Sequence, residues 1–258
     1  MTHRPVPAEA KSCAAPLVVS PEKPKLATKA VFFDWYNTLA RYDPPNEALQ
    51  ATACRSFGIV VDSRKLLKGI AEADRYMYQE NMNSRVDKRP PNEQVEIYTH
   101  YEDIVLKTAG VNVPRGLALP IWMKVRDMAK GSTFMLFDDV LPALDELRKR
   151  SLVLGMISNL LQDMMPLVSR LGMVTYVDYV VNPQAAGADK PDLKIFQYAL
   201  EQARVENSEA LYVGDQYDVD VAGAQSAGIR AILLDRYDIH PDIDCPRIQS
   251  LMEVAAYL

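Results

Sequence analysis

The sequence predicts an α/β fold in which helices cover both faces of a parallel sheet. Two observations lead to this class. Short, uniformly apolar runs alternate with helical patterns along most of the chain, which is typical of parallel strands joined by helical crossovers. The stretch 46–133 interrupts that rhythm, because it contains helical patterns and no convincing strand.

Five segments have the composition of strands that are buried on both faces of a sheet. They are residues 30–33, 151–158, 176–181, 210–214 and 230–235. A helical pattern at 140–150 precedes the second segment, and further patterns at 161–171, 192–203 and 219–227 separate the later ones. These segments predict a doubly covered sheet that begins at residue 30.

Residues 46–133 are expected to form a helical lid. The segment 62–78 has the spacing of an amphipathic helix, with apolar residues Leu66, Leu67, Ile70, Met77 and Tyr78. The segment 92–110 has a second helical pattern that stops at Gly110, a residue suited to a helix C-terminus. Because the insert enters just after the first strand, we expect it to overhang that strand's end; helices packed on the sheet's flank are the alternative.

Composition narrows the class of protein. The net charge of -5 and the lack of a dense basic run argue against nucleic-acid binding, and no apolar run reaches the ~20 residues of a membrane span. The three cysteines lack disulfide or zinc spacing, which favours a cytoplasmic setting. Three histidines and no GxSxG turn leave little for a Ser-His-Asp hydrolase. Residues 1–29, with five prolines and a local charge of +3, are expected to be disordered.

Polar residues follow the predicted strands at their carboxyl ends, where open parallel sheets bind ligands. In chain order they are Asp34, Ser158 with Asn159, Lys190, Asp215 and Asp220. Each one alone is more typical of a turn or a helix cap. Their occurrence at successive strand ends indicates one shared site.

This set of side chains has the chemistry needed to hydrolyse a phosphate ester. Mg²⁺ takes one or two carboxylates together with water and phosphate, so Asp34 and Asp215 are candidate ligands. The metal and Lys190 would offset the charge of the phosphate and let the Asp34 carboxylate approach it. Asp34 would then form an aspartyl-phosphate that water hydrolyses, while the Ser158 hydroxyl holds the transferring oxygens.

These residues lie in four short motifs that resemble those of the haloacid dehalogenase superfamily of hydrolases. The motifs are DWYNT, the serine of MISN, the lysine of GADKPD, and GDQYDVD, in that order between residues 29 and 236. The resemblance implies a Rossmann-like, three-layer core formed by residues 30–45 and 134–258. It also implies that residues 46–133 are a helical cap, and that the protein is a Mg²⁺-dependent phosphatase with a small-molecule substrate.

The resemblance further implies a role for each motif residue. Asp34 would be the nucleophile, Lys190 would steady it, and Thr38 would support its loop. The metal would be held by Asp34, Asp215 and the backbone carbonyl of Tyr36, with Asp220 orienting its water or Lys190. Substrate contacts are expected from Tyr36, Asn159 and Arg41. Neither a membrane nor a nucleic-acid partner is expected, and the sequence does not indicate an oligomeric state.

Tyr36 departs from the phosphatase pattern. Family phosphatases usually have an aspartate there that protonates the leaving oxygen, and losing such a group typically removes about 10²–10⁴-fold in rate. The pattern D-x-Y-x-T resembles the 2-haloacid dehalogenases, which use no metal and expel a halide that needs no proton. Asp215 favours a metal-using phosphatase, since dehalogenases tend to have serine there. We therefore predict a phosphatase, with a dehalogenase or a catalytically impaired binding protein as alternatives.

Overall fold

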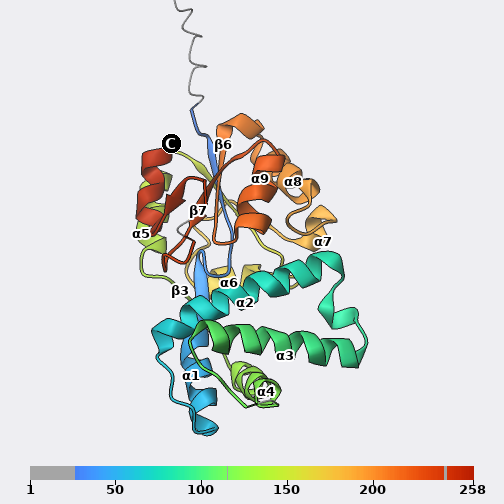
Figure 1. The fold of residues 1–258 in the computed structure, drawn as a ribbon. Helices are drawn as coiled ribbons and strands as arrows, with labels where there is room; N and C mark the ends of the chain where they lie inside the picture. Colours follow the sequence, from blue (N-terminus) through green and yellow to red (C-terminus); the bar gives the residue numbers. More distant parts are fainter. Residues whose placement is uncertain (1–26, 115, 241–242) are drawn as a thin grey trace, which may run out of the picture.

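A computed structural model describes residues 27–114, 116–240 and 243–258 (Figure 1). Its centre is a six-stranded sheet in the order β5-β4-β1-β6-β7-β8, in which all neighbouring strands are parallel. The strands are β1 (Ala30–Phe33), β4 (Val153–Ile157), β5 (Tyr179–Val181), β6 (Ala210–Gly214), β7 (Arg230–Leu234) and β8 (Arg247–Ile248). The predicted α/β class is confirmed. The disorder predicted for residues 1–29 falls, up to residue 26, outside the described residues.

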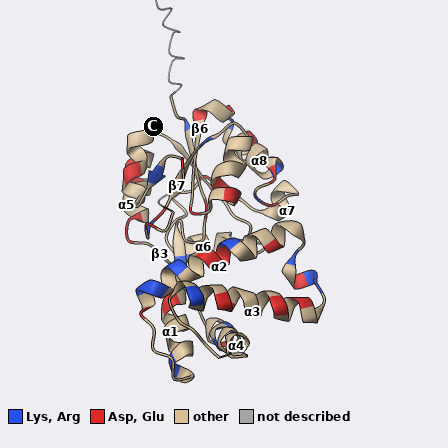
Figure 2. Ribbon diagram, viewed as in Figure 1, with Lys and Arg blue, Asp and Glu red and all other residues tan. Residues whose placement is uncertain are grey.

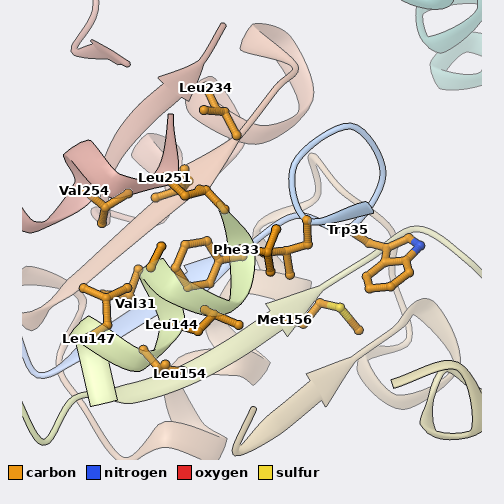
Figure 3. Close-up of a cluster of buried hydrophobic side chains, with 14 of the residues drawn as sticks. Val31, Phe33, Trp35, Leu144, Leu147, Leu154, Met156, Leu234, Leu251 and Val254 are labelled. Carbon is orange, nitrogen blue, oxygen red and sulfur yellow. The ribbon is translucent and has the colours of Figure 1, made fainter. Parts of the chain in front are cut away.

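Helices cover both faces of this sheet. One face packs against α5 (Val140–Lys149), α6 (Met165–Arg170) and a C-terminal 3₁₀ helix (Leu251–Tyr257). The other packs against α8 (Leu193–Ala203) and α9 (Ala222–Ser226). In β1, Val31 and Phe33 belong to the first core and Phe32 to the second, because successive side chains of a strand point to opposite faces. Figure 3 shows the first core, where Val31 and Phe33 meet Leu144 of α5.

Four helices form an insert between β2 and β3, called here the helical insert (residues 46–129). They are α1 (Asn46–Ser56), α2 (Ser63–Asn83), α3 (Pro91–Thr108) and α4 (Ala118–Ala129), and a short 3₁₀ helix, Val86–Lys88, links α2 to α3. The insert has apolar clusters of its own, centred on Leu66 with Val105 and on Leu106 with Ile121. It lies beyond the carboxyl ends of the strands, with α2 nearest the sheet (Figure 1). None of the described helices is both long and apolar enough to cross a membrane.

The two helices predicted from the insert's sequence are present. The pattern at 62–78 becomes α2, and the pattern at 92–110 becomes α3. Gly110 adopts φ +78 just beyond the end of α3, a left-handed conformation that glycine adopts without steric cost. The division of the chain into core and cap at residues 45 and 133 stays a prediction.

Three short strands were missed by the sequence analysis. β2 (Ala40–Asp43) and β3 (Thr133–Leu136) pair antiparallel across the whole helical insert, so β3 begins inside the stretch expected to lack strands. β8 has two residues. These strands are too short to give a periodic pattern, and both β2 and β3 are mostly half-buried or exposed rather than uniformly apolar.

Several predicted segments have different bounds in the structure. The strand predicted at 176–181 is restricted to 179–181. The helix predicted at 161–171 begins only at Met165, where Pro166 fits the first turn. The helix predicted at 219–227 is a π-helical turn, Tyr217–Val221, followed by α9. Short helices at Pro183–Ala186 (α7) and Asn207–Glu209 precede α8 and β6 respectively.

The close packing of α2 on α3 depends on Gly69. A β-carbon at this position would overlap the backbone carbonyl of Val105, which cannot move without shifting α3. We expect Gly69→Ala to lower the free energy of unfolding by about 1–3 kcal/mol, although alanine favours helix, because overpacking outweighs propensity. Urea unfolding followed by circular dichroism measures the change. Gly131→Ala is the matched control, since nothing lies within 4 Å of a β-carbon there. Equal stability of the two variants would contradict the prediction.

Candidate active site

The predicted site residues meet at one edge of the sheet because the strands that carry them are parallel and in register. Phe33, the last residue of β1, lies opposite Met156 of β4 and Val213 of β6. Asp34 follows immediately, and Ser158 and Asp215 follow the two neighbouring strands. β1 lies between the two halves of the sheet, β4 and β5 on one side and β6 to β8 on the other, which is where such sheets bind ligands.

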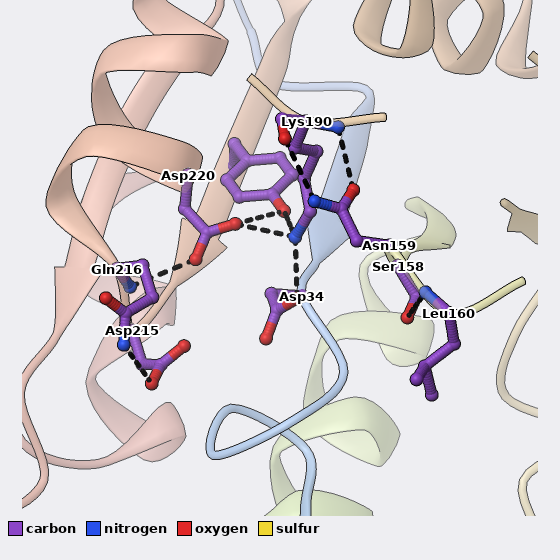
Figure 4. Close-up of polar contacts among 9 residues, drawn as sticks. Asp34, Ser158, Asn159, Leu160, Lys190, Asp215, Gln216 and Asp220 are labelled. Carbon is purple, nitrogen blue, oxygen red and sulfur yellow. Dashed lines mark hydrogen bonds and ion pairs between the residues drawn. The ribbon is translucent and has the colours of Figure 1, made fainter. Parts of the chain in front are cut away.

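Lys190 lies at the centre of the site. Its Nζ donates hydrogen bonds to Asp34 Oδ1 at 2.6 Å, to Asp220 Oδ1 at 2.7 Å and to the Tyr212 hydroxyl at 3.0 Å (Figure 4). All three donors of the ammonium are therefore engaged, and its side chain is only 2% exposed. Lys190 thus links Asp34, which follows β1, to Tyr212 in β6 and to Asp220 in the turn after β6.

Asn159 fixes the backbone of Lys190. Its side-chain Nδ2 donates to the Lys190 carbonyl at 2.9 Å, and its Oδ1 accepts from the Lys190 N–H at 2.7 Å. Asn159 is a predicted substrate contact, and in the structure both ends of its amide hold the loop that carries the lysine. The neighbouring Ser158 is buried, and its Oγ accepts from the Leu160 N–H at 3.2 Å.

Asp220 is held from three directions. Its Oδ1 accepts from Lys190 and from the Tyr212 hydroxyl at 2.9 Å, and its Oδ2 accepts from the Gln216 N–H at 3.0 Å. The side chain packs so closely against β6 that a β-carbon at Gly214 would overlap the carboxyl group. Tyr212 and Gly214 were missed as site residues because they lie in a run that reads only as a buried strand. The one sequence feature that could have indicated this role is the hydroxyl of Tyr212 within an otherwise apolar strand.

Three carboxylates cluster around a single ammonium. Asp34, Asp215 and Asp220 each offer an oxygen, and these oxygens lie within 4.8 Å of one another. Asp215 is the least engaged of the three, with Gln216 Nε2 donating to its Oδ2 at 3.3 Å. Lys190 supplies one positive charge against three negative ones, so the described site has an excess of negative charge.

The pKa shifts reflect this imbalance. Burial raises the pKa of Asp34 to about 6, although the ammonium of Lys190 lowers it. Burial and the charges of Asp34 and Asp220 raise the pKa of Asp215 well above its usual value. Burial alone would lower the pKa of Lys190, but Asp220 and Asp34 raise it, so the ammonium stays charged. A hard divalent cation fits this donor set, because carboxylate oxygens are its preferred ligands and two further positive charges would balance the cluster.

A cavity of about 250 Å³ opens onto Asp34, Lys190 and Asp220, whereas Asp215 lines an adjoining cavity. Asp34, Ser158, Lys190 and Asp220 lie on one side of it. Four aromatic side chains also line it, namely Tyr36, Tyr42, Tyr78 and Phe134, together with Asn159, Leu160, Gln216 and Val219. Since Tyr78 belongs to α2, the helical insert contributes one wall. The cavity therefore combines charged and aromatic side chains, as small-molecule sites do.

The loop after β1 places the remaining residues of the first motif. The Leu39 and Ala40 N–H groups both donate to the Trp35 carbonyl, which folds the chain back, and Asn37 adopts φ 60, a conformation that asparagine tolerates. Thr38 is fully buried in this turn, and its Oγ1 has no hydrogen-bond partner among the described residues. The Tyr36 hydroxyl accepts from Asn46 Nδ2 at 2.6 Å.

Arg41 lies apart from the cavity of Asp34. It lines an adjoining cavity together with Tyr36, Asp74 and Asp215. Its guanidinium lies 5.4 Å from the centre of the Phe137 ring. The predicted contact between Arg41 and substrate would therefore lie in the adjoining cavity and not beside Lys190.

Comparisons with known proteins place this site in a family. The model of the haloacid dehalogenase-like hydrolase family matches residues 28–228. The human haloacid dehalogenase-like hydrolase domain-containing protein 3 is 30% identical over 81% of this chain and 83% of its own length. The glyceraldehyde 3-phosphate phosphatase of Methanopyrus kandleri is 27% identical over 89% of this chain and 98% of its own length.

Solved structures of this family have the same fold. The chain is similar to a HAD phosphatase from Thermococcus onnurineus, with a TM-score of 0.51 and 21% identity over 89% of this chain and 97% of that one. It is also similar to a 2-haloacid dehalogenase from Pseudomonas syringae pv. Tomato, with a TM-score of 0.50 and 26% identity over 89% and 97%. All four sequence motifs fall within the residues that the family model matches. The chain belongs to the haloacid dehalogenase-like hydrolase family.

Proposed function

We propose that this protein is a Mg²⁺-dependent phosphatase that hydrolyses a small phosphorylated metabolite through an aspartyl-phosphate at Asp34. The observation that carries the proposal is the grouping of Asp34 with Asp215 and Asp220 around the Lys190 ammonium. A dehalogenase has no need of a third carboxylate that attracts a cation. The phosphatase name of the Methanopyrus kandleri relative supports the same substrate class.

The residues of the site suit the binding of a phosphate next to Asp34. When bound by Asp34, Asp215 and the backbone carbonyl of Tyr36, Mg²⁺ would supply positive charge to the phosphate oxygens. Ser158 lines the same cavity as Asp34, and its hydroxyl would donate to one of these oxygens. Asp220 keeps Lys190 charged and in place, and Lys190 in turn orients the Asp34 carboxylate.

The reaction would proceed in two displacements at phosphorus. Lys190 engages Asp34 Oδ1, so Oδ2 is the oxygen available for attack. Attack by Asp34 forms the aspartyl-phosphate as the bond from phosphorus to the leaving oxygen breaks. Water then attacks the phosphorus atom, which releases inorganic phosphate and regenerates the Asp34 carboxylate.

A 2-haloacid dehalogenase is the second candidate, and Tyr36 is the residue that favours it. Tyr36, Tyr42, Tyr78 and Phe134 give the cavity an apolar wall, which suits a small halogenated acid. A halide leaves without being protonated, so no aspartate is needed at residue 36. In this reaction Asp34 would attack carbon instead of phosphorus, and no metal would take part.

Metal removal separates the two candidates. We expect the purified protein to hydrolyse phosphate esters, to lose that activity in EDTA and to regain it with excess Mg²⁺, because the carboxylate cluster needs the cation's charge. Phosphate release and chloride release from 2-chloropropionate, each measured with and without EDTA, provide the test. Chloride release that EDTA does not affect would exclude the phosphatase in favour of the dehalogenase.

The nucleophile is tested by Asp34→Asn. The amide cannot form the acyl-phosphate, so turnover should fall to background under steady-state conditions, while the variant should still fold. Phosphate release is the measurement, and Asp145→Asn on the exposed side of α5 is the control. Residual turnover in a variant shown by mass spectrometry to be free of deamidation would rule out covalent catalysis at Asp34.

The metal ligand is tested by Asp215→Asn. This substitution removes one charge from the cluster and leaves a neutral ligand, so Mg²⁺ affinity should fall by about tenfold or more. Isothermal titration of Mg²⁺ into the wild type and the variant gives the ratio without relying on turnover. Asp218→Asn, a nearby exposed carboxylate, should leave the affinity unchanged. Equal affinities in Asp215→Asn and the wild type would remove Asp215 from the ligand set.

A further inference from the structure

The helix α2 of the helical insert presents one face to the site. Asp74 and Tyr78 are four residues apart, so they lie on the same side of the helix. Tyr78 lines the cavity that contains Asp34, and Asp74 lines the adjoining cavity that contains Asp215. Tyr36, Tyr42 and Gln216 line both cavities, so the two cavities share a wall at these residues.

A contact next to Asp74 places this part of α2 near the edge of the sheet. Arg75 Nε lies 3.9 Å from Asp218 Oδ2, and Asp218 belongs to the π-helical turn that also carries Asp220. Basic and acidic residues lie close together along α2 in Figure 2. The turn of α2 that carries Asp74 therefore lies beside the loop that follows Asp215.

Asp74 has one oriented oxygen and one free oxygen. The Tyr101 hydroxyl donates to Asp74 Oδ1 at 2.8 Å, which links α3 to α2 and fixes the carboxyl group. Its Oδ2 makes no hydrogen bond or ion pair within residues 27–114, 116–240 and 243–258. Burial raises the pKa of Asp74 to about 6, while the Tyr101 hydrogen bond lowers it. A protonated carboxyl group is thus accessible close to neutral pH.

We propose that Asp74 is the general acid and base of this enzyme, supplying from the helical insert the proton transfer that Tyr36 cannot perform. The proposal rests on the phosphatase function proposed above. It does not require a change in the site around Lys190. It assigns the leaving-group end of the substrate to the cavity that Asp74 and Asp215 line.

In the two displacements Asp74 gives up one proton and takes one back. Asp74 begins protonated and gives its proton to the leaving oxygen as the bond between phosphorus and that oxygen breaks and Asp34 Oδ2 bonds to phosphorus. The alcohol departs and Asp74 is left as a carboxylate. It then takes a proton from the water that attacks phosphorus, the Asp34–phosphorus bond breaks, and inorganic phosphate leaves. Asp74 is protonated again, and the sum is an ester plus water giving an alcohol plus phosphate.

Two esters with different leaving groups test this role. An alkyl phosphate such as glycerol 3-phosphate needs a proton on its leaving oxygen, whereas 2,4-dinitrophenolate leaves without one. We expect Asp74→Asn to slow turnover of the alkyl ester by about 10²-fold or more. With the dinitrophenyl ester, the first turnover should keep its rate within about threefold, and a slower steady state should follow because water is no longer activated.

Matched variants separate catalysis from structure. In Asp74→Asn the amide oxygen of the new side chain can still accept from Tyr101, and a thermal unfolding midpoint checks that the variant is folded. Glu72 lies on the same helix but lines neither cavity, so Glu72→Gln should leave the turnover of both esters unchanged. Tyr101→Phe keeps the carboxyl group and removes its anchor, so it should cause a smaller loss with the same preference for the dinitrophenyl ester. This variant also provides the test if Asp74→Asn does not fold.

Three results would overturn the assignment of Asp74. One is an equal loss of first-turnover rate on both esters, and another is no loss on either while the wild type hydrolyses both. The third is the ester-dependent loss appearing in Glu47→Gln, which removes another carboxylate of the adjoining cavity. If the wild type hydrolyses neither ester with Mg²⁺ present, the proposed phosphatase function fails and the role of Asp74 falls with it.

Discussion

The site is organised by one buried ammonium group. Lys190 has almost no contact with bulk water, and its three donors are satisfied by Asp34, Asp220 and Tyr212. A buried charge is tolerated only when it is paired and hydrogen-bonded, and removing either partner would leave the other uncompensated. The ammonium therefore fixes where the carboxylates can lie. With Asp215 close by, it also leaves the cluster short of positive charge, which is the physical reason why a divalent cation would suit this edge.

The sheet and its apolar layers keep Lys190 and the carboxylates around it in place. Parallel strands in register bring Asp34 and Asp215 to the same level, since each comes directly after a central strand. Asn159 ties the lysine's own loop to the end of β4 through two hydrogen bonds. Apolar layers on both faces of the sheet keep the strands fixed, so the charged groups cannot move apart to relieve their repulsion. Packing thereby maintains an arrangement that electrostatics alone would oppose.

With tyrosine at position 36, the group that transfers the proton would have to come from the helical insert. A short aspartate at this position would keep proton transfer within the loop after β1. Tyrosine instead fills the space between two cavities, with its hydroxyl bonded to Asn46 at the start of α1. In the proposed arrangement the nucleophile belongs to the sheet and the proton donor, Asp74, to α2. Chemistry would then depend on the insert lying against the sheet, so that water is excluded when the reaction can proceed.

The class of fold follows from the sequence, because uniformly apolar runs separated by helical patterns are compatible with few other folds. Motifs at the strand ends likewise indicate Asp34, Lys190 and Asp215. The sequence did not reveal the pairing of β2 with β3, whose partners are far apart in the chain and too short to give a pattern. Nor did it reveal the hydroxyl of Tyr212 beside Lys190, or the face that Asp74 presents to the site. Periodicity in the sequence indicates which side of a helix or strand is buried. Which residues face each other across a cavity depends on how distant segments pack together.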